Sequence, residues 1–326
     1  MRNARATRIT RLTWAALLVA CETESPTRSD ARAPEPRLHS FARSEWSAPV
    51  NLGPIINGPA NDNAPALSKD GLTLYFLSDR PGGAGRNDIW FSRRACIDCP
   101  WQPPQNLSVI NSPFGDGGPD LSIDGHLLFF VSNRPGGRGE GDIWVSRRAD
   151  PNDDLGWGTP TPLGSGVNTA DGENGPEYLQ SAEEGAANLY FSRGVFPAFA
   201  ADIYYAAVEK DGETRGPAVL VTELSMPMAN DASPTVRQDG REIYFWSFGP
   251  GRPGTLGGGD LLVSTRRSVH DPWSPPVMLA PPLNTTFGEI GPELSFDGRT
   301  LIFVSNRPGG FGLFDLWMST RTPSGK

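Results

Sequence analysis

The stretch that decides the fold is residues 65–94, PALSKDGLTLYFLSDRPGGAGRNDIWFSRR. It returns as residues 119–148, PDLSIDGHLLFFVSNRPGGRGEGDIWVSRR, and as residues 292–321, PELSFDGRTLIFVSNRPGGFGLFDLWMSTR. Two looser copies begin at Pro176 and Pro234, so the chain contains five copies. A period of this length predicts one supersecondary unit per copy, because a single unit cannot bury its apolar face alone.

Each copy predicts three strands. The Asp-Gly pair favours a tight hairpin, and the apolar run after it (LTLYFLS in the first copy) indicates a strand buried on both faces. A Pro-Gly-Gly loop then leads to a strand around Asp-Ile-Trp. A shorter motif, Trp-x-x-Pro-x-x-Leu, predicts a fourth strand, which must be an edge strand because proline donates no ladder hydrogen bond. The motif occurs at residues 46–52, 101–107, 157–163 and 273–279, with a degenerate version at 215–221.

The ends of the repeat indicate a closed ring. The folded part opens with a fourth strand at Trp46–Leu52 and closes with three strands at Pro292–Arg321. Neither end is a whole unit, and together they make one. We therefore predict an all-β protein, a five-bladed β-propeller of four-stranded antiparallel blades, in which the N-terminal strand completes the last blade.

The first twenty residues have the pattern of a secretory signal peptide. Four arginines, the last of them Arg11, precede the apolar run Leu12–Ala20, which is too short to span a bilayer. The run ends in Leu-Val-Ala-Cys21, which resembles the lipobox of bacterial lipoproteins, where cleavage before the cysteine precedes its lipidation. We predict a lipoprotein signal peptide at residues 1–20 and lipidation at Cys21. An ordinary signal peptide with a chance cysteine is the alternative.

Residues 21–43 are expected to form the lipidated end and a flexible tether, because they are rich in Pro, Ser, Arg and Glu and poor in apolar side chains. The propeller then occupies residues 44–326. Cleavage removes four of the 29 basic residues and no acid, which leaves 25 against 37 acidic residues and a net charge of −12. That balance argues against nucleic acid as a partner. It also leaves the lipid anchor as the expected contact with a membrane.

The consensus SxDGxxLYFxSxRPGGxGxxDIW, as at Ser68–Trp90, resembles the WD40-like propeller repeat of the TolB family and of related bacterial envelope proteins. The resemblance covers nearly the whole mature domain. It implies a propeller that is secreted across the inner membrane and held in the cell envelope, on the periplasmic side or at the outer membrane. TolB-like proteins scaffold interactions there. The resemblance implies no activity, because propellers host many unrelated functions.

An acidic residue stands three positions before the repeat proline in every unit. These residues are Asp62, Asp116, Glu173, Asp231 and Glu289. The loop after the second strand contains Arg80, Arg134, Arg193 or Arg307 in four units and should lie on the same face of the ring. A ring of five carboxylates could bind a cation or a basic partner. Its occurrence in all five units favours a structural role instead, with each acid paired to an arginine or capping loop N–H groups.

The remaining reactive residues give no metal or cofactor signature. Cys96 and Cys99 lie in one loop, where we predict a local disulfide, since an exported protein meets an oxidising environment. Zinc would require two more ligands, and the three histidines, at positions 39, 126 and 270, are scattered. The sequence therefore predicts no cofactor.

Symmetry breaks in the loops after the second strand of units three and four. Residues 194–199 and 248–253 replace the Arg-Pro-Gly-Gly pattern and contain Phe196, Phe199 and Phe248. Exposed aromatic side chains beside polar ones are typical of an interaction patch. Drift in a surface loop is the alternative.

From these features we predict a non-catalytic binding or scaffolding lipoprotein of the bacterial cell envelope, with an envelope protein or glycan as its partner. The alternative is a propeller-fold glycoside hydrolase, or another polysaccharide-acting enzyme, with carboxylates at the central channel. The candidate acids all fall on repeated positions, which favours the non-catalytic interpretation. An enzyme would instead show two or three unpaired channel carboxyls with perturbed pKa values.

Overall fold

The computed structural model describes residues 45–180, 187–195, 200–209 and 211–322. The chain divides into residues 1–38 and residues 39–326, and every described residue belongs to the second unit. The described residues form strands and turns without an α-helix, and so contain no helix that could cross a membrane.

The described residues form twenty strands in five four-stranded antiparallel sheets, and the strands of each sheet are named a, b, c and d from the ring axis outward. Blade 1 contains β2 (Asp62–Leu67), β3 (Thr73–Ser78), β4 (Asp88–Arg93) and β5 (Gln105–Asn106). Blade 2 contains β6 (Asp116–Leu121), β7 (Leu127–Ser132), β8 (Asp142–Arg147) and β9 (Thr161–Pro162). Blade 3 contains β10 (Gly172–Gln180), β11 (Ala187–Val195), β12 (Ala200–Val208) and β13 (Val219–Leu220). Blade 4 contains β14 (Asn230–Val236), β15 (Glu242–Phe248), β16 (Asp260–Thr265) and β17 (Val277–Met278). Blade 5 contains β18 (Glu289–Leu294), β19 (Thr300–Ser305), β20 (Asp315–Thr320) and β1 (Val50–Asn51).

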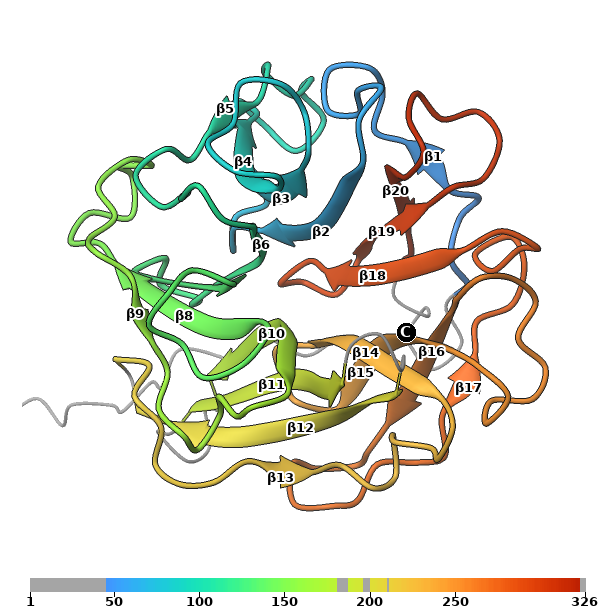
Figure 1. Cartoon of the computed structure of the whole chain (residues 1–326). Helices are drawn as coiled ribbons and strands as arrows, with labels where there is room; N and C mark the ends of the chain where they lie inside the picture. Colours follow the sequence, from blue (N-terminus) through green and yellow to red (C-terminus); the bar gives the residue numbers. More distant parts are fainter. Residues whose placement is uncertain (1–44, 181–186, 196–199, 210, 323–326) are drawn as a thin grey trace, which may run out of the picture. The chain divides into compact units, whose positions relative to one another are not determined.

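The predicted closure of the ring is confirmed. Strand β1, from the start of the described chain, pairs with β20 in the register Val50↔Met318 and Asn51↔Trp317. The side chain of Asn51 also donates to Oδ2 of Asp315 at 3.0 Å. In Figure 1 the blue β1 lies beside the red β20, so the two ends of the folded part complete one blade.

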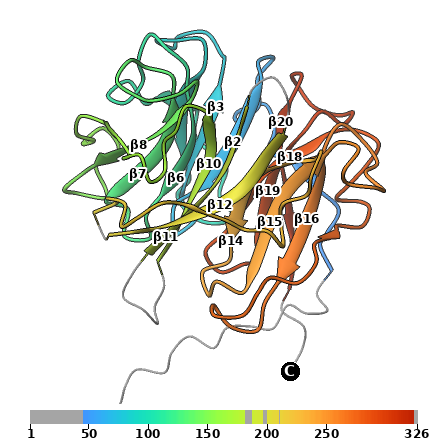
Figure 2. The same cartoon turned by 60° about the horizontal axis from the view of Figure 1, so that its bottom comes forward.

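The apolar b strands form the core between blades, as their unbroken hydrophobic runs predict. Phe76, Phe129, Phe130, Phe245 and Phe303 are fully buried. Figure 2 shows the strands of the blades side by side. Buried apolar clusters join each sheet to its neighbours, so the faces of adjacent sheets pack against each other. Burial on both faces explains why these strands lack the alternation of a half-exposed sheet.

The tryptophan of the Trp-x-x-Pro-x-x-Leu motif stacks under an arginine at the end of strand c. The guanidinium carbon lies 4.1–4.6 Å from the ring centroid in four blades. The pairs are Arg94–Trp101, Arg148–Trp157, Arg266–Trp273 and Arg321–Trp46. This cation–π contact explains why the motif accompanies the short d strands of these four blades.

Each inner strand carries a β-bulge just before the repeat proline. The pairing register shifts there, and the preceding residue has a positive φ of 44–57°. These residues are Ala64, Gly118, Gly175, Ser233 and Gly291. A Cβ placed on Gly175 would lie 2.7 Å from Cα of Ser233, so neighbouring bulges crowd each other near the axis. Bulges of this kind re-aim the side chains that follow them.

Candidate functional site

A cavity of about 330 Å³ lies between the inner strands of the ring. Its wall includes the five bulges, together with Asn87, Asn133 and Gly115 from the connecting loops. Asn87 and Asn133 belong to the loops between strands b and c, so the cavity opens toward that face of the propeller. A concave site of this size is at the small end of the range for ligand pockets.

Three carboxyl groups line this cavity at one repeated position, directly after the repeat proline. They are Asp120 on β6, Glu177 on β10 and Glu293 on β18. Their residues are only 8%, 9% and 8% exposed, respectively. Among the described residues, no Lys, Arg or His forms an ion pair with them. The site thus gathers three nearly buried acids that have no cationic partner in the described chain.

Burial shifts the protonation of all three groups. It raises the pKa of Asp120 to about 7, although N–H bonds from Tyr178 and Leu121 favour the charged form. Burial and then the negative charge of Asp120 raise the pKa of Glu293 to about 8. Burial, followed by the charges of Asp120 and Glu293, raises the pKa of Glu177 well above its ordinary value. As the pH rises through neutral, Asp120 therefore ionises before Glu293.

A backbone N–H of the following blade holds each of these carboxyls in place. One oxygen of the carboxyl accepts the bond, and the donor is the second residue after the next repeat proline. The bonds join Asp120 to Tyr178 (2.6 Å), Glu177 to Val236 (2.8 Å) and Glu293 to Leu67 (2.9 Å). The carboxyls are thereby fixed before any ligand arrives.

The other two blades have uncharged residues at the same position. The hydroxyl of Thr235 in blade 4 accepts the N–H of Leu294 at 3.2 Å and lies 3.4 Å from Oε2 of Glu293. Ala66 in blade 1 offers no polar side chain. Among the described residues, no group of three or more His, Cys, Asp and Glu has the arrangement of a metal site.

Sequence reasoning missed Asp120, Glu177 and Glu293. The signal was present, because the residue after the repeat proline is Ala, Asp, Glu, Thr and Glu in the five units. Within an otherwise regular motif, this position varies in chemistry from blade to blade. The acid three positions before the proline, in contrast, occurs in all five units, and a structural need shared by the blades is the simpler cause of that recurrence.

The acids three positions before the proline are placed differently, beside arginines. Their side chains are completely buried, and each makes one ion pair. The pairs are Asp62–Arg80 (2.5 Å), Asp116–Arg134 (2.6 Å), Glu173–Arg193 (2.8 Å), Asp231–Arg252 (2.9 Å) and Glu289–Arg307 (3.0 Å). Arg252 was not predicted as a partner, because it lies farther along a loop that lacks the Arg-Pro-Gly-Gly pattern.

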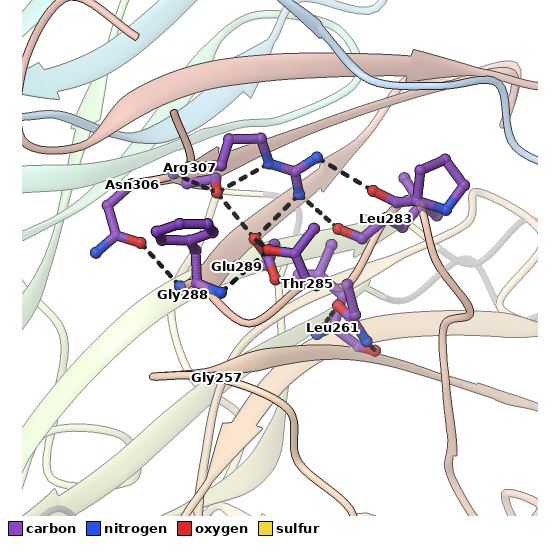
Figure 3. Close-up of polar contacts among 12 residues, drawn as sticks. Gly257, Leu261, Leu283, Thr285, Gly288, Glu289, Asn306 and Arg307 are labelled. Atoms are coloured by element: carbon purple, nitrogen blue, oxygen red, sulfur yellow. Dashed lines mark hydrogen bonds and ion pairs between the residues drawn. The ribbon is translucent and has the colours of Figure 1, made fainter. Parts of the chain in front are cut away.

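Figure 3 shows one member of this set, Glu289, at the centre of its contacts. It accepts the backbone N–H and the hydroxyl of Thr285 at 2.8 and 2.7 Å. Arg307 binds the same carboxyl and also donates to the carbonyl of Leu283 at 2.6 Å. Glu289 and Arg307 therefore bind the segment between blades 4 and 5 to the loop between strands b and c of blade 5.

The other predicted site residues lie apart from the cavity or outside the described chain. Cys21, Phe196 and Phe199 are outside the described residues. Phe248 ends β15, half-buried, with its ring 5.9 Å from that of Trp246 and nearly parallel to it. Cys96 and Cys99 are joined by a disulfide in the loop after β4.

Comparison with known proteins finds relatives by structure and none by sequence. No family model matches the chain, and no curated protein matches it in sequence. An arabinanase from Bacillus subtilis has a TM-score of 0.57 at 14% identity, over 82% of this chain and 96% of its own. An α-L-arabinofuranosidase from Lactobacillus brevis has a TM-score of 0.56 at 13% identity, over 83% and 92%. The catalytic domain of a family-62 α-L-arabinofuranosidase from Coprinopsis cinerea has 0.54 at 14%, over 86% and 97%.

These similar structures are glycoside hydrolases rather than TolB-like or WD40-like proteins. At such low identity the likeness shows the fold, a five-bladed propeller. The finding that the similar structures are hydrolases contradicts two predictions, that the chain is a non-catalytic scaffold and that it is not an enzyme, and both predictions are wrong. They rested on acids that recur in every blade and are ion-paired, whereas the cavity contains three unpaired carboxyls from only three of the blades.

Proposed function

We propose that this chain is a glycoside hydrolase that cleaves a polysaccharide or oligosaccharide with Asp120, Glu177 and Glu293. The observation that carries the proposal is their convergence from three blades on one cavity, nearly buried and without a cationic partner in the described chain. The fold shared with arabinanases and arabinofuranosidases supports it.

Hydrolysis of a glycosidic bond requires two carboxyl groups in opposite protonation states. One donates a proton to the leaving oxygen, and the other, ionised, activates water or attacks the sugar carbon. Asp120, whose pKa is about 7, supplies the ionised carboxylate. Glu293, whose pKa is about 8, still holds most of its proton at the same pH, and burial likewise raises the pKa of Glu177, so one of these two groups is the donor.

Joining blades does not by itself explain these acids. An amide side chain could accept the N–H of the next blade equally well, without the cost of burying an ionisable group. Thr235 serves that purpose in blade 4 with an uncharged hydroxyl. The presence of carboxyl groups at these positions therefore requires an explanation other than the joining of blades. Acid–base chemistry is one explanation that uses their raised pKa values.

The test is release of sugar from a panel headed by arabinan and aryl α-L-arabinofuranosides, the substrates suggested by the names of the similar structures. The variants Asp120→Asn, Glu177→Gln and Glu293→Gln keep an oxygen acceptor for the neighbouring N–H and remove the acid. We expect Asp120→Asn and at least one of the two glutamate variants to lower kcat/KM by about 100-fold or more. Thermal melting checks that the fold is kept.

Glu289→Gln is the matched control, because Glu289 is equally buried but ion-paired and does not line the cavity. After correction for folded fraction, it should keep activity. Activity that survives all three cavity variants would contradict the proposal, as would a wild-type chain that neither cleaves nor binds any sugar of the panel.

We further propose that the enzyme acts in the bacterial cell envelope, anchored through a diacylglycerol on Cys21. The lipobox-like residues before Cys21 and the resemblance of the repeat to envelope propellers support this location. Metabolic labelling with palmitate tests it: wild type should incorporate label and partition with membranes, and Cys21→Ser should not. An unlabelled wild-type chain would refute the anchor.

A further inference from the structure

The charge of the cavity bears on the class of sugar that it accepts, an inference that rests on the proposed function. Among the described residues that line it, the ionisable ones are Asp116, Asp120, Glu177 and Glu293. Arg134 neutralises Asp116 at 2.6 Å, and the corresponding arginines of the other blades are likewise paired with acids. The cavity thus presents the negative charge of ionised Asp120 with no described cation to balance it, so a uronate or sulfate group entering it would be repelled.

The uncharged part of the wall is suited to hydroxyl groups. Oδ1 of Asn63 accepts the N–H of Ala64 at 2.7 Å, and Oδ1 of Asn174 accepts that of Gly175 at 2.8 Å. These bonds orient both amides, and their Nδ2 groups have no acceptor among the described residues. Two fixed amide NH2 groups are therefore available to donate hydrogen bonds to sugar oxygens at the cavity wall.

One aromatic side chain breaks the symmetry of the wall. The b-strand position before the conserved serine is Leu77, Val131 and Val304 in three blades, and Trp246 occupies it in blade 4. Trp246 lines the cavity, half-buried, with its indole N–H directed to Oγ of Ser233 at 3.3 Å. The negative face of an aromatic ring attracts the weakly positive C–H groups of a sugar ring.

We infer that the central cavity selects uncharged saccharides, that Trp246 provides the stacking surface for the bound sugar ring, and that the carboxyl cluster excludes uronates and other anionic sugars. The amides of Asn63 and Asn174 then orient the hydroxyl groups. Trp246 is a specificity-determining residue in this scheme, and the acids have a second role beside catalysis.

The experiment measures binding separately from cleavage. Neutral trisaccharides (arabino-, xylo-, cello- and galactotriose) and trigalacturonate are titrated at about pH 8, with tryptophan fluorescence and calorimetry as readouts, against wild type and three variants. Trp246→Val has the side chain that blades 2 and 5 already have at this position, and Trp246→Phe keeps a ring. The third is the triple variant Asp120→Asn, Glu177→Gln, Glu293→Gln.

We expect wild type to bind at least one neutral trisaccharide and to bind trigalacturonate at least about tenfold more weakly. Trp246→Val should weaken neutral binding about tenfold or more, as loss of an aromatic anchor does, and Trp246→Phe should retain most of it. The triple variant should lose most of the discrimination against trigalacturonate.

Preferred binding of trigalacturonate, or discrimination that persists in the triple variant, would overturn the charge argument. Neutral binding unchanged in Trp246→Val would overturn the stacking role. Binding of neutral sugars without cleavage would contradict the proposed hydrolase and leave this inference standing, whereas cleavage of anionic glycans would do the opposite. Absence of binding to every trisaccharide would refute the inference.

Discussion

Raising the pH from about 5 to about 8 is expected to destabilise the folded chain, because the cavity acids are more easily protonated in the folded state than in the unfolded one. Burial raises the pKa of Asp120 from 3.8 to about 7 and that of Glu293 from 4.5 to about 8. Between the two pKa values of each group, the folded state holds a proton that the unfolded chain has released. Stability is therefore greatest below the unfolded pKa and falls as the pH rises through the folded one.

The size of the effect follows from the shifts. At about 1.4 kcal/mol per pKa unit, Asp120 alone lowers the free energy of unfolding by about 3 kcal/mol between about pH 5 and about pH 8. Glu293 contributes a similar amount, so the two together reach about 6 kcal/mol. For a domain of this size such a change corresponds to a fall in Tm of roughly 10 °C or more.

Urea denaturation followed by tryptophan fluorescence at several pH values measures this slope. The triple variant Asp120→Asn, Glu177→Gln, Glu293→Gln is the control, because the three substituted side chains do not titrate. Burial also raises the pKa of Glu173, Asp231 and Asp260, so the variant should keep a smaller slope of the same sign. A variant slope equal to that of wild type, or a wild type more stable at about pH 8 than at about pH 5, would refute the reasoning.

Three further predictions concern stability. Removing residues 45–53 deletes β1 and exposes the edge of β20, so the truncated chain should aggregate or melt at lower temperature in size-exclusion and thermal assays; a melting curve like that of the full chain would contradict closure. Asp116→Asn leaves a buried guanidinium without its counter-charge and should lower the free energy of unfolding by about 1–3 kcal/mol in urea, and no change would indicate that the ion pair is not stabilising. Gly175→Ala should cost about 2 kcal/mol or more, because the new Cβ would meet the neighbouring bulge at 2.7 Å. Gly118→Ala has a similar φ but a nearest neighbour at 3.4 Å and should cost only about 1 kcal/mol; equal losses would refute the crowding argument.

The local sequence was sufficient to predict the blades. The Asp-Gly turns, the doubly buried apolar runs and the proline-bearing edge strands each have a geometry of their own, independent of distant residues. The incomplete units at the two ends also predicted that β1 would pair with β20, since only that pairing completes a fifth blade. The five-bladed ring could therefore be predicted from the sequence alone.

The convergence of the three cavity carboxyls could not be predicted in the same way. Asp120, Glu177 and Glu293 are separated by more than 50 residues along the chain, and nothing in the local pattern says that they share one cavity. The bulges of the inner strands, with positive φ even at Ala64 and Ser233, also depend on packing against neighbouring blades.

What the sequence by itself determined was the blade, its number of copies and its closure, because these follow from short-range turn chemistry and hydrophobic patterning. What only the tertiary structure decided was which acids matter chemically. Pairing of strands a and b within each blade places the ion-paired acids beside arginines. Ring closure brings three other carboxyls together in a cavity without a described cation. Burial raises the pKa values of all three cavity carboxyls, and the charge of Asp120 adds to the effect at Glu177 and Glu293. Both effects exist only once distant segments have been brought together.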